Sequence, residues 1–508
     1  MMIADDIRSG KYTHIADAAE ELERFVTDAA RDGLSLHDVE KATLETVLAM
    51  GNKAVDLFLR LQGNGDLGPT VEIQDGSTLY RSEEPQPRRI RTIFGEHIFD
   101  GYAYARGPKR KIELRPLDAR MSLPEGEFSY LLEEFSQYFC VEQAFGQARQ
   151  ALEKVLQQEV PVDSLERISR RVATQAKTFL EQVPRPPAKE EGKFLVLTSD
   201  GKGVPMIREN VEPVVPFAQG GERRGNRQMA TVASVYSVDE FVRTPEEVVA
   251  ALFREGPRPR RADRPKPCHK RMVARFARLY EDGEGTITVP GSFEALSWGA
   301  AEVRKRRQAG QTLLRLGDGQ EDLWDVGRSC LEEQYENVVD ILDILHVSSY
   351  VWSAARAFCG KNETAVRAFA RERLLTILQG NARGVIRGLR RMATERGLSG
   401  QAAKEVATAC GYFEKNLHRM RYDEYLAAGC PIASGVIEGA CRHLVKDRME
   451  RSGMRWIPEG AQAMLDVRAL EVSRLWDDFQ QARQSADVER LHPHRQLLDN
   501  YVPFALAV

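Results

Sequence analysis

The sequence predicts a mixed α/β domain with a helical insertion, preceded by mainly α-helical N-terminal domains. Apolar residues recur every three or four positions before residue 62 and again from 128 to 182, short apolar runs typical of buried strands begin at 194, and the helical period returns from 347. With 508 residues, the chain is long enough for roughly three domains of about 150 residues each.

The N-terminal part is expected to hold five helices and one small β hairpin. The hairpin is placed at 90–104, where aromatic and β-branched residues alternate with other residues. The last three helices could form a helix-turn-helix in which Arg167, Arg170 and Arg171 contact phosphate, although three-helix modules also serve as scaffolds. The expected helices are 13–31, 35–61, 128–139, 141–157 and 163–182.

The α/β part follows a Pro-rich joint at 183–188. A helix from Ser292 to Arg306 comes after the third strand, and strands and helices then alternate, which matches the order of an RNase H-like domain. The expected strands are 194–198, 229–238, 286–289, 312–316 and 338–343. The later helices are expected within 347–429, from 434 to 450, and from 458 to 483.

These elements predict seven segments along the chain. The first three are an N-terminal helical region, a β-rich or irregular segment and a helical, possibly DNA-binding domain, at 1–62, 63–127 and 128–188. The next three are the first part of the RNase H-like core, the helical insertion and the rest of the core, at 189–346, 347–429 and 430–485. A tail completes the chain at 486–508.

Composition indicates a cytoplasmic protein. Its apolar share of 42% and charged share of 29% are those of a soluble domain, no stretch is long and apolar enough to span a membrane, and the polar start is unlike a signal peptide. Seven cysteines lie scattered without a CxxC pair, which argues against a disulfide framework and a thiolate zinc site.

The net charge of −3 conceals a strongly basic block at 254–278. Ten of its residues are Lys or Arg, opposed only by Glu255 and Asp263. Such a block would be attracted to phosphates, although a solvated Pro-rich loop is the alternative interpretation.

Two aspartates occupy matching positions, each expected at the carboxyl end of a strand and each followed by Gly. They are Asp200 in TSDGKG and Asp318 in LGDGQE, and ligands bind at such strand ends because the chain turns there. A third acid, Glu438, lies on the helix of ASGVIEGACRHLVKDR, with Arg442 and Lys446 one and two turns further on. Either Asp-Gly alone is typical of a turn, so the prediction depends on the whole set.

Three converging carboxylates have the right chemistry for Mg²⁺ or Mn²⁺, which favour oxygen ligands. Two such ions, about 4 Å apart, can activate a water or a 3′-hydroxyl and stabilise the leaving oxygen of a phosphoryl displacement. The residues therefore suggest a metal-dependent nuclease.

Longer stretches resemble the ISKra-type insertion-sequence transposases, a bacterial DDE family. The segment IASGVIEGACRHLVKDRMERSGMRWIPEGAQAMLDVRAL is similar to the Glu-bearing region of that family, LGDGQEDLW with ILDILHVSSYVWSAA to its second-Asp region, and TSDGKGVPM to its first-Asp motif. The resemblance implies that Asp200, Asp318 and Glu438 form the catalytic, metal-binding triad. It also implies that Asp343 and His346 are a supporting Asp-x-x-His pair.

By this resemblance the chain is a DNA transposase of a mobile element. It would bind the ends of an insertion sequence, cleave and join DNA with two Mg²⁺ or Mn²⁺ ions, and act as a homo-oligomer on end and target DNA at the nucleoid. An RNase H-like nuclease without strand joining and a domesticated, non-catalytic DNA-binding protein are the alternatives.

Two aromatic side chains have a functional and a structural interpretation each. His346 is expected to donate a hydrogen bond to Asp343, or else to be a core histidine. Trp456 could stack on an unpaired base, or else pack in the core. The residues expected to contact DNA are Arg258, Arg260, Arg261, Arg264, Lys270, Arg271, Arg442, Lys446, Arg448, Arg451, Arg455 and Trp456.

Overall fold

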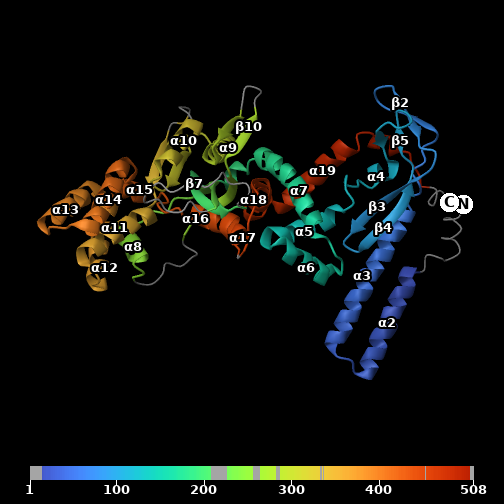
Figure 1. Cartoon of the computed structure of the whole chain (residues 1–508), viewed down its shortest axis with the longest axis horizontal. Helices are drawn as coiled ribbons and strands as arrows, with labels where there is room; N and C mark the ends of the chain where they lie inside the picture. The colour runs from blue at the N-terminus through green and yellow to red at the C-terminus, as the bar shows by residue number, and fades with distance from the viewer. Residues whose placement is uncertain are drawn as a thin grey trace. The chain divides into compact units, whose positions relative to one another are not determined.

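The computed structural model describes residues 14–207, 226–255, 264–281, 286–331, 335, 337–451 and 453–503. Two compact units make up the chain (Figure 1). The first joins Met1–Arg171 to Asp477–Val508, and the second is Val172–Trp476. Within the described residues, no helix is long and apolar enough to cross a membrane.

The first unit begins with a helical hairpin and continues with small β-sheets. The hairpin consists of α2 (His14–Asp32) and α3 (Leu36–Arg60), as the periodicity predicted. The expected β hairpin is present as β3 (Gln86–Thr92) paired with β4 (Gly95–Gly101). A separate sheet has the order β1-β2-β5-β6. Its strands are Thr70–Glu72, Thr78–Arg81, Tyr104–Ala105 and Ile112–Leu114.

Helices complete the first unit around a buried acid. Glu133 on α5 is fully buried and pairs with Arg171 on α7 and with Arg483 on α19. Arg171, expected to contact phosphate, is half-buried and engaged in this ion pair, whereas Arg167 and Arg170 are exposed. The helices are α4 (Pro116–Arg120), α5 (Tyr130–Glu142), α6 (Phe145–Leu156), α7 (Val162–Gln182, which continues into the second unit) and α19 (Trp476–Leu491).

A five-stranded mixed sheet with the order β13-β12-β7-β8-β9 forms the centre of the second unit. Within this sheet, β8 is antiparallel to both β7 and β9, and β12 and β13 run parallel to β7. Helix α9 (Gly291–Arg306) packs on β8, and α18 (Pro458–Val472) packs on β9. The strands are β7 (Phe194–Pro205), β8 (Arg227–Val238), β9 (Cys268–Arg275), β12 (Thr312–Gly317) and β13 (Val338–Leu342).

The expected third strand was wrong. Residues Thr286–Val289 form β11, which pairs with β10 (Arg278–Glu281) in a separate hairpin, and β9 takes the third position in the sheet. The basic sequence of β9 tolerates burial because acids on the adjacent helices neutralise its arginines. Arg271 pairs with Glu302 of α9 at 2.5 Å, and Arg275 pairs with Asp466 of α18.

The first strand is longer than expected. β7 continues through Asp200 to Pro205 because β8 pairs with it along its whole length, from Val238 opposite Phe194 to Arg227 opposite Pro205. Asp200 lies opposite Val232 within this ladder, so the expected turn at its Asp-Gly pair was wrong.

The helical segment after β13 is present as predicted. One apolar core joins these helices to the sheet, with Leu314, Ile341 and Leu374 among its members. The helices are α11 (Ile344–Cys359), α12 (Glu363–Leu378), α13 (Ala382–Glu395), α14 (Gly400–Asn416) and α15 (Tyr422–Ala427).

Glu438 lies on a helix that changes its winding. It begins as α16 (Gly435–Ala440), continues as a π-helix at Cys441–Lys446 and ends as α17 (Asp447–Met449). The helix expected at 458–483 is interrupted, since α18 ends at Val472, Arg474 has a φ of 58°, and α19 begins at Trp476.

Candidate metal centre

Three aspartates follow the paired segments of the neighbouring strands β7, β12 and β13. The β7–β12 pairing ends with Thr198 opposite Leu316, and Asp200 and Asp318 come two residues later in their segments. The β12–β13 pairing ends with Gly317 opposite Leu342, and Asp318 and Asp343 come next in theirs. The three aspartates, up to 143 positions apart in the sequence, thus belong to the same end of the sheet.

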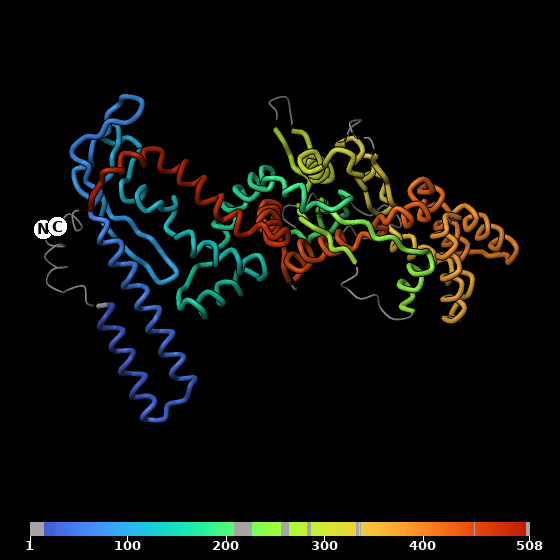
Figure 2. Tube along the Cα trace, turned by 180° about the vertical axis from the view of Figure 1, so that it is seen from behind, coloured from blue at the N-terminus to red at the C-terminus, as the bar shows by residue number. Residues whose placement is uncertain are grey.

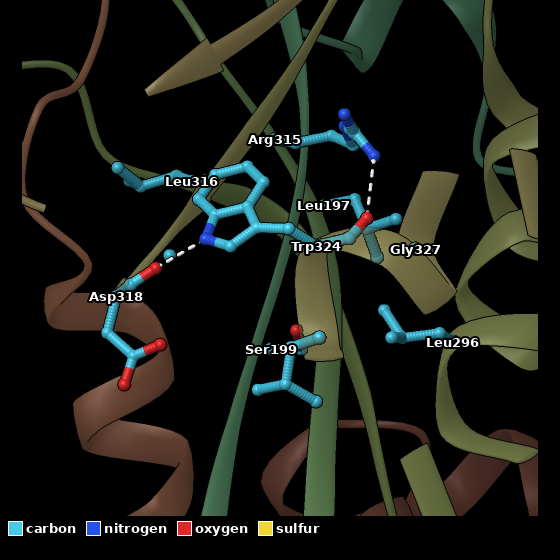
Figure 3. Close-up of a pocket in the computed structure, with 10 residues that line it drawn as sticks. Leu197, Ser199, Leu296, Arg315, Leu316, Asp318, Trp324 and Gly327 are labelled. Atoms are coloured by element: carbon cyan, nitrogen blue, oxygen red, sulfur yellow. Dashed lines mark hydrogen bonds between the residues drawn. The ribbon is translucent and has the colours of Figure 1, made fainter. Parts of the chain in front are cut away.

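Asp318 is held by the start of the segment that follows it. Its Oδ1 accepts a hydrogen bond from the backbone N–H of Gln320 at 3.0 Å, and its carbonyl accepts one from the Trp324 indole at 2.5 Å. Figure 3 shows the carboxylate directed away from the indole. The adjoining cavity, lined by Leu197, Ser199 and Trp324 among others, measures about 20 Å³, which is room for about one water molecule and not for a substrate.

Asp343 joins the end of the sheet to the segment that carries Glu438. Its side chain caps α11, where Oδ1 accepts a hydrogen bond from the Leu345 N–H at 2.8 Å. The other oxygen accepts a hydrogen bond from the Ser434 hydroxyl, and the residue is fully buried. Among the described residues, these bonds replace the one expected from His346.

Asp343, His346 and Glu438 together could hold a metal ion. One potential ligand atom from each lies within 4.8 Å of the other two. Asp343 is buried, His346 half-buried and Glu438 exposed, so the group opens towards solvent. The sequence predicted Glu438 as a ligand with Asp200 and Asp318, whereas this group combines Glu438 with the pair assigned only a supporting role.

Asp200 belongs to the same electrostatic environment. Although Glu438 is exposed as a residue, its carboxyl group is partly desolvated, which raises its pKa; the negative charges of Asp343 and Asp200 raise it further, and His346 lowers it. Carboxylates crowded in this way favour the arrival of a cation, which would offset their repulsion.

Cys441 is a residue of this site that the sequence interpretation missed. Its thiol donates a hydrogen bond to Oδ2 of Asp200 at 3.5 Å, while the Gly201 N–H donates to Oδ1 at 2.6 Å. Burial and the Asp200 carboxylate raise the pKa of the Cys441 thiol, which keeps it protonated as a donor. Cys441 lies three residues after Glu438 on the same helix, and this spacing could have indicated that both side chains face the site.

The residues expected to contact DNA fall into three groups. Arg258, Arg260 and Arg261 lie outside the described residues. The exposed members, together with the half-buried Lys270, are Arg264, Arg442, Lys446, Arg451 and Arg455. The buried members are Arg271, Arg448 and Trp456.

The burial of Arg271, Arg448 and Trp456 contradicts the expected contact of these side chains with DNA. Arg271 is 5% exposed and donates to Glu302 and to the Pro184 carbonyl. The Arg448 guanidinium lies 4.9 Å from the ring centroid of Trp456.

Trp456 itself is fixed in the protein interior. Its indole donates to the Met449 carbonyl at 3.2 Å, and its backbone exchanges hydrogen bonds with Pro205 and Ile207 at the end of β7. This aromatic side chain closes the core beside β7 and is not available to stack on a base.

Comparison with known proteins adds only weak structural similarity. No protein-family model matches the chain, and no curated protein matches it. A solved structure described as "Drosophila P element transposase strand transfer complex" is similar over 72% of this chain and 92% of that chain, with 11% identity and a TM-score of 0.23. A score this low does not establish a shared fold, so the functional argument depends on the site itself.

Proposed function

We propose that this chain is a DNA transposase of the DDE type, in which Asp200, Asp318 and Glu438 carry metal-dependent strand cleavage and strand transfer. The observation that carries the proposal is that Glu438 lies within ligand distance of Asp343 and His346 and in the field of Asp200, while Asp318 follows the adjacent strand β12. Carboxylates gathered at one site are the ligand set for a phosphoryl-transfer centre.

The architecture supports an RNase H-like catalytic core. Within the five-stranded sheet, three antiparallel strands come first in the chain, α9 follows them, and the two parallel strands come last, as expected of that fold. A helical insertion then separates β13 from the Glu438 helix. We also propose that the chain is a member of the ISKra-type family, whose resemblance to this sequence assigns the triad to Asp200, Asp318 and Glu438.

The donor set fits Mg²⁺ or Mn²⁺. Asp200, Asp318 and Glu438 offer oxygen ligands, and the His346 nitrogen beside Glu438 is compatible with Mn²⁺. When bound, two such cations would supply an activated attacking oxygen and a stabilised leaving oxygen. Asp343, tied to Leu345 and Ser434, would position the strand end and the Glu438 segment relative to each other.

The chain's own residues preorganise the acids for this role. Cys441 and the Gly201 N–H fix both oxygens of Asp200, while Gln320 and Trp324 fix Asp318. Fixed ligands reduce the reorganisation needed when the reaction begins.

The proposed partner is DNA, both the ends of an insertion sequence and a target. Arg442 and Lys446 are exposed on the helix that carries Glu438, where they could contact the phosphate backbone. A homo-oligomer on DNA at the nucleoid completes the proposal, since the joining of two ends needs two active sites.

The decisive test uses a plasmid that carries the DNA flanking the gene, incubated with purified protein and Mg²⁺ or Mn²⁺. Asp200→Asn, Asp318→Asn and Glu438→Gln should each abolish cleavage while DNA binding persists, because the amides keep shape but lose the charge that holds cations. Asp322→Asn, which changes an exposed acid on α10 (Glu321–Leu331), is the matched control.

The products separate the proposal from its alternatives. Cleavage followed by joining to a second DNA supports a transposase, and cleavage without joining indicates a nuclease. DNA binding without metal-dependent cleavage by the wild type would indicate a non-catalytic protein and contradict the proposal.

A further inference from the structure

The helical insertion contacts the segment that carries Asp318. Both views show the insertion helices, in orange, next to α10, in yellow, which follows Asp318 in the chain (Figures 1 and 2). Arg419 and Lys415, at and just beyond the end of α14, pair with Glu321 at the start of α10 at 3.3 Å and 3.8 Å. The insertion therefore reaches the residues directly after this proposed metal ligand.

Arg419 also acts on Asp318 through Trp324. Its guanidinium is fully buried and lies 4.2 Å from the centroid of the Trp324 ring. The indole N–H of Trp324 in turn donates to the Asp318 carbonyl (Figure 3). The insertion thus helps to fix the backbone at Asp318.

Tyr412 on α14 approaches the same segment. A Cβ atom at Gly319 would lie 2.3 Å from Cε2 of the Tyr412 ring and 2.9 Å from its hydroxyl oxygen, so the ring lies directly against the glycine backbone. Gly319 does not have a positive φ, so its backbone conformation does not require glycine. The close approach of Tyr412 does require it, because a side chain at this position would displace the ring.

Packing fixes where the Tyr412 hydroxyl lies. The ring stacks on Tyr350 of α11, with 4.0 Å between the centroids and 19° between the planes, and Phe413 meets it edge-on. Within α14, the Tyr412 carbonyl accepts a hydrogen bond from the Asn416 side chain at 2.9 Å. A ring held in this way presents its hydroxyl at one place, beside Gly319.

The Tyr412 hydroxyl has a proton to donate. Its oxygen is buried beside the Gly319 N–H, and within the described residues its proton has no acceptor. Burial raises the pKa of this phenol and the negative charge of Asp318 raises it further, so the hydroxyl is protonated at neutral pH. Buried tyrosine hydroxyls normally have a hydrogen-bond partner, so an unpaired donor next to a proposed metal ligand indicates a role for it.

We propose that Tyr412 is a positioning residue of the metal centre, whose hydroxyl donates a hydrogen bond to the Asp318 carboxylate and orients it towards a cation. This inference rests on the proposed function, in which Asp318 is a metal ligand. Oδ1 of Asp318 accepts a hydrogen bond from the Gln320 N–H, and within the described residues Oδ2 accepts none. A local adjustment of the Asp318 side chain brings Oδ2 to the Tyr412 hydroxyl.

The resulting arrangement matches that of Asp200. There, the Gly201 N–H and the Cys441 thiol donate to the two carboxylate oxygens. A carboxylate oxygen that accepts one hydrogen bond keeps a second lone pair for a cation. Donors of this kind orient a metal ligand, and their loss lowers metal affinity about 10–100-fold.

The test is a titration of the full chain with Mn²⁺ in the absence of DNA, in which electron paramagnetic resonance measures the free ion. Tyr412→Phe keeps the ring and removes only the hydroxyl, and it should raise the Mn²⁺ dissociation constant at least about tenfold. Its melting temperature without metal should equal or exceed that of wild type, because a buried donor without a partner is removed.

Two further variants define the site and the comparison. Asp318→Asn identifies the ion that belongs to this site, since that ion should be lost. Tyr350→Phe, which removes the hydroxyl of the stacked neighbour, is the matched control and should bind Mn²⁺ like wild type.

The other outcomes overturn the inference. If Tyr412→Phe bound Mn²⁺ like wild type while Asp318→Asn lost the ion, the hydroxyl would have no role at the centre and the proposed function would stand. An equal loss of affinity in Tyr350→Phe, or a clearly lower melting temperature of Tyr412→Phe without metal, would show that the hydroxyl serves only the packing. If wild type and Asp318→Asn bound Mn²⁺ alike, Asp318 would not be a ligand, which would contradict the proposed function together with this inference.

Discussion

Replacement of Arg271 by alanine should destabilise the protein instead of weakening DNA contact directly. Its guanidinium donates to Glu302 and to the Pro184 carbonyl, both at 2.5 Å, and Glu302 is 1% exposed. Loss of one partner from a buried ion pair costs about 3–5 kcal/mol. Arg306 and Lys305 lie 3.8 Å and 3.1 Å from the Glu302 carboxylate and would still neutralise part of its negative charge in the variant. We therefore expect a loss at the lower end of this range, about 3 kcal/mol.

Thermal unfolding by circular dichroism measures this change. About 3 kcal/mol corresponds to a fall in melting temperature on the order of 10 °C in a unit of this size. Arg264→Ala, at an exposed position of the same basic block, should change the melting temperature by no more than a few degrees. If Arg271→Ala melted like wild type and instead flattened the salt dependence of DNA binding, the buried ion pair would be refuted as its role.

Three further outcomes follow from the metal centre and its surroundings. Because partial burial and the neighbouring carboxylates raise the pKa of Glu438, the free energy of unfolding without metal should fall as pH rises through that pKa, and Glu438→Gln should remove this fall. An unchanged pH profile of melting would contradict it. Cys441→Ala should slow metal-dependent cleavage more than Cys441→Ser, which keeps a donor for Asp200; equal rates would remove the thiol from this role. Trp456→Ala should cost about 3–5 kcal/mol of stability, and an unchanged denaturation midpoint would show that its ring is not packed in the core.

Local periodicity was sufficient to predict most of the helices and strands. The helices α2, α3 and α5 to α7 follow spacings of three and four, and α12 lies within the expected helical insertion. These patterns are local, because the side of a helix that packs is encoded within a few turns.

The sequence predicted less well which segments become strands of the sheet, and where those strands end, when this depends on a distant partner. β9 contains basic residues that read as a solvated or phosphate-binding block, but Glu302 and Asp466 approach from distant helices and neutralise Arg271 and Arg275. The Asp-Gly pair at Asp200 is typical of a turn, yet the partner strand β8 keeps it extended. Neither partner is adjacent in the sequence, so neither effect has a local signal.

The sequence by itself determined which acids were available and that two of them lie near or at the ends of apolar segments. Only the tertiary structure decided which side chains meet: Glu438 near Asp343 and His346, Ser434 on Asp343 across 91 positions, and Cys441 on Asp200 across 241. The physical reason is that secondary structure depends on side-chain spacing within a few residues. Contacts at a metal centre depend instead on register and helix packing, which are set by the whole core at once.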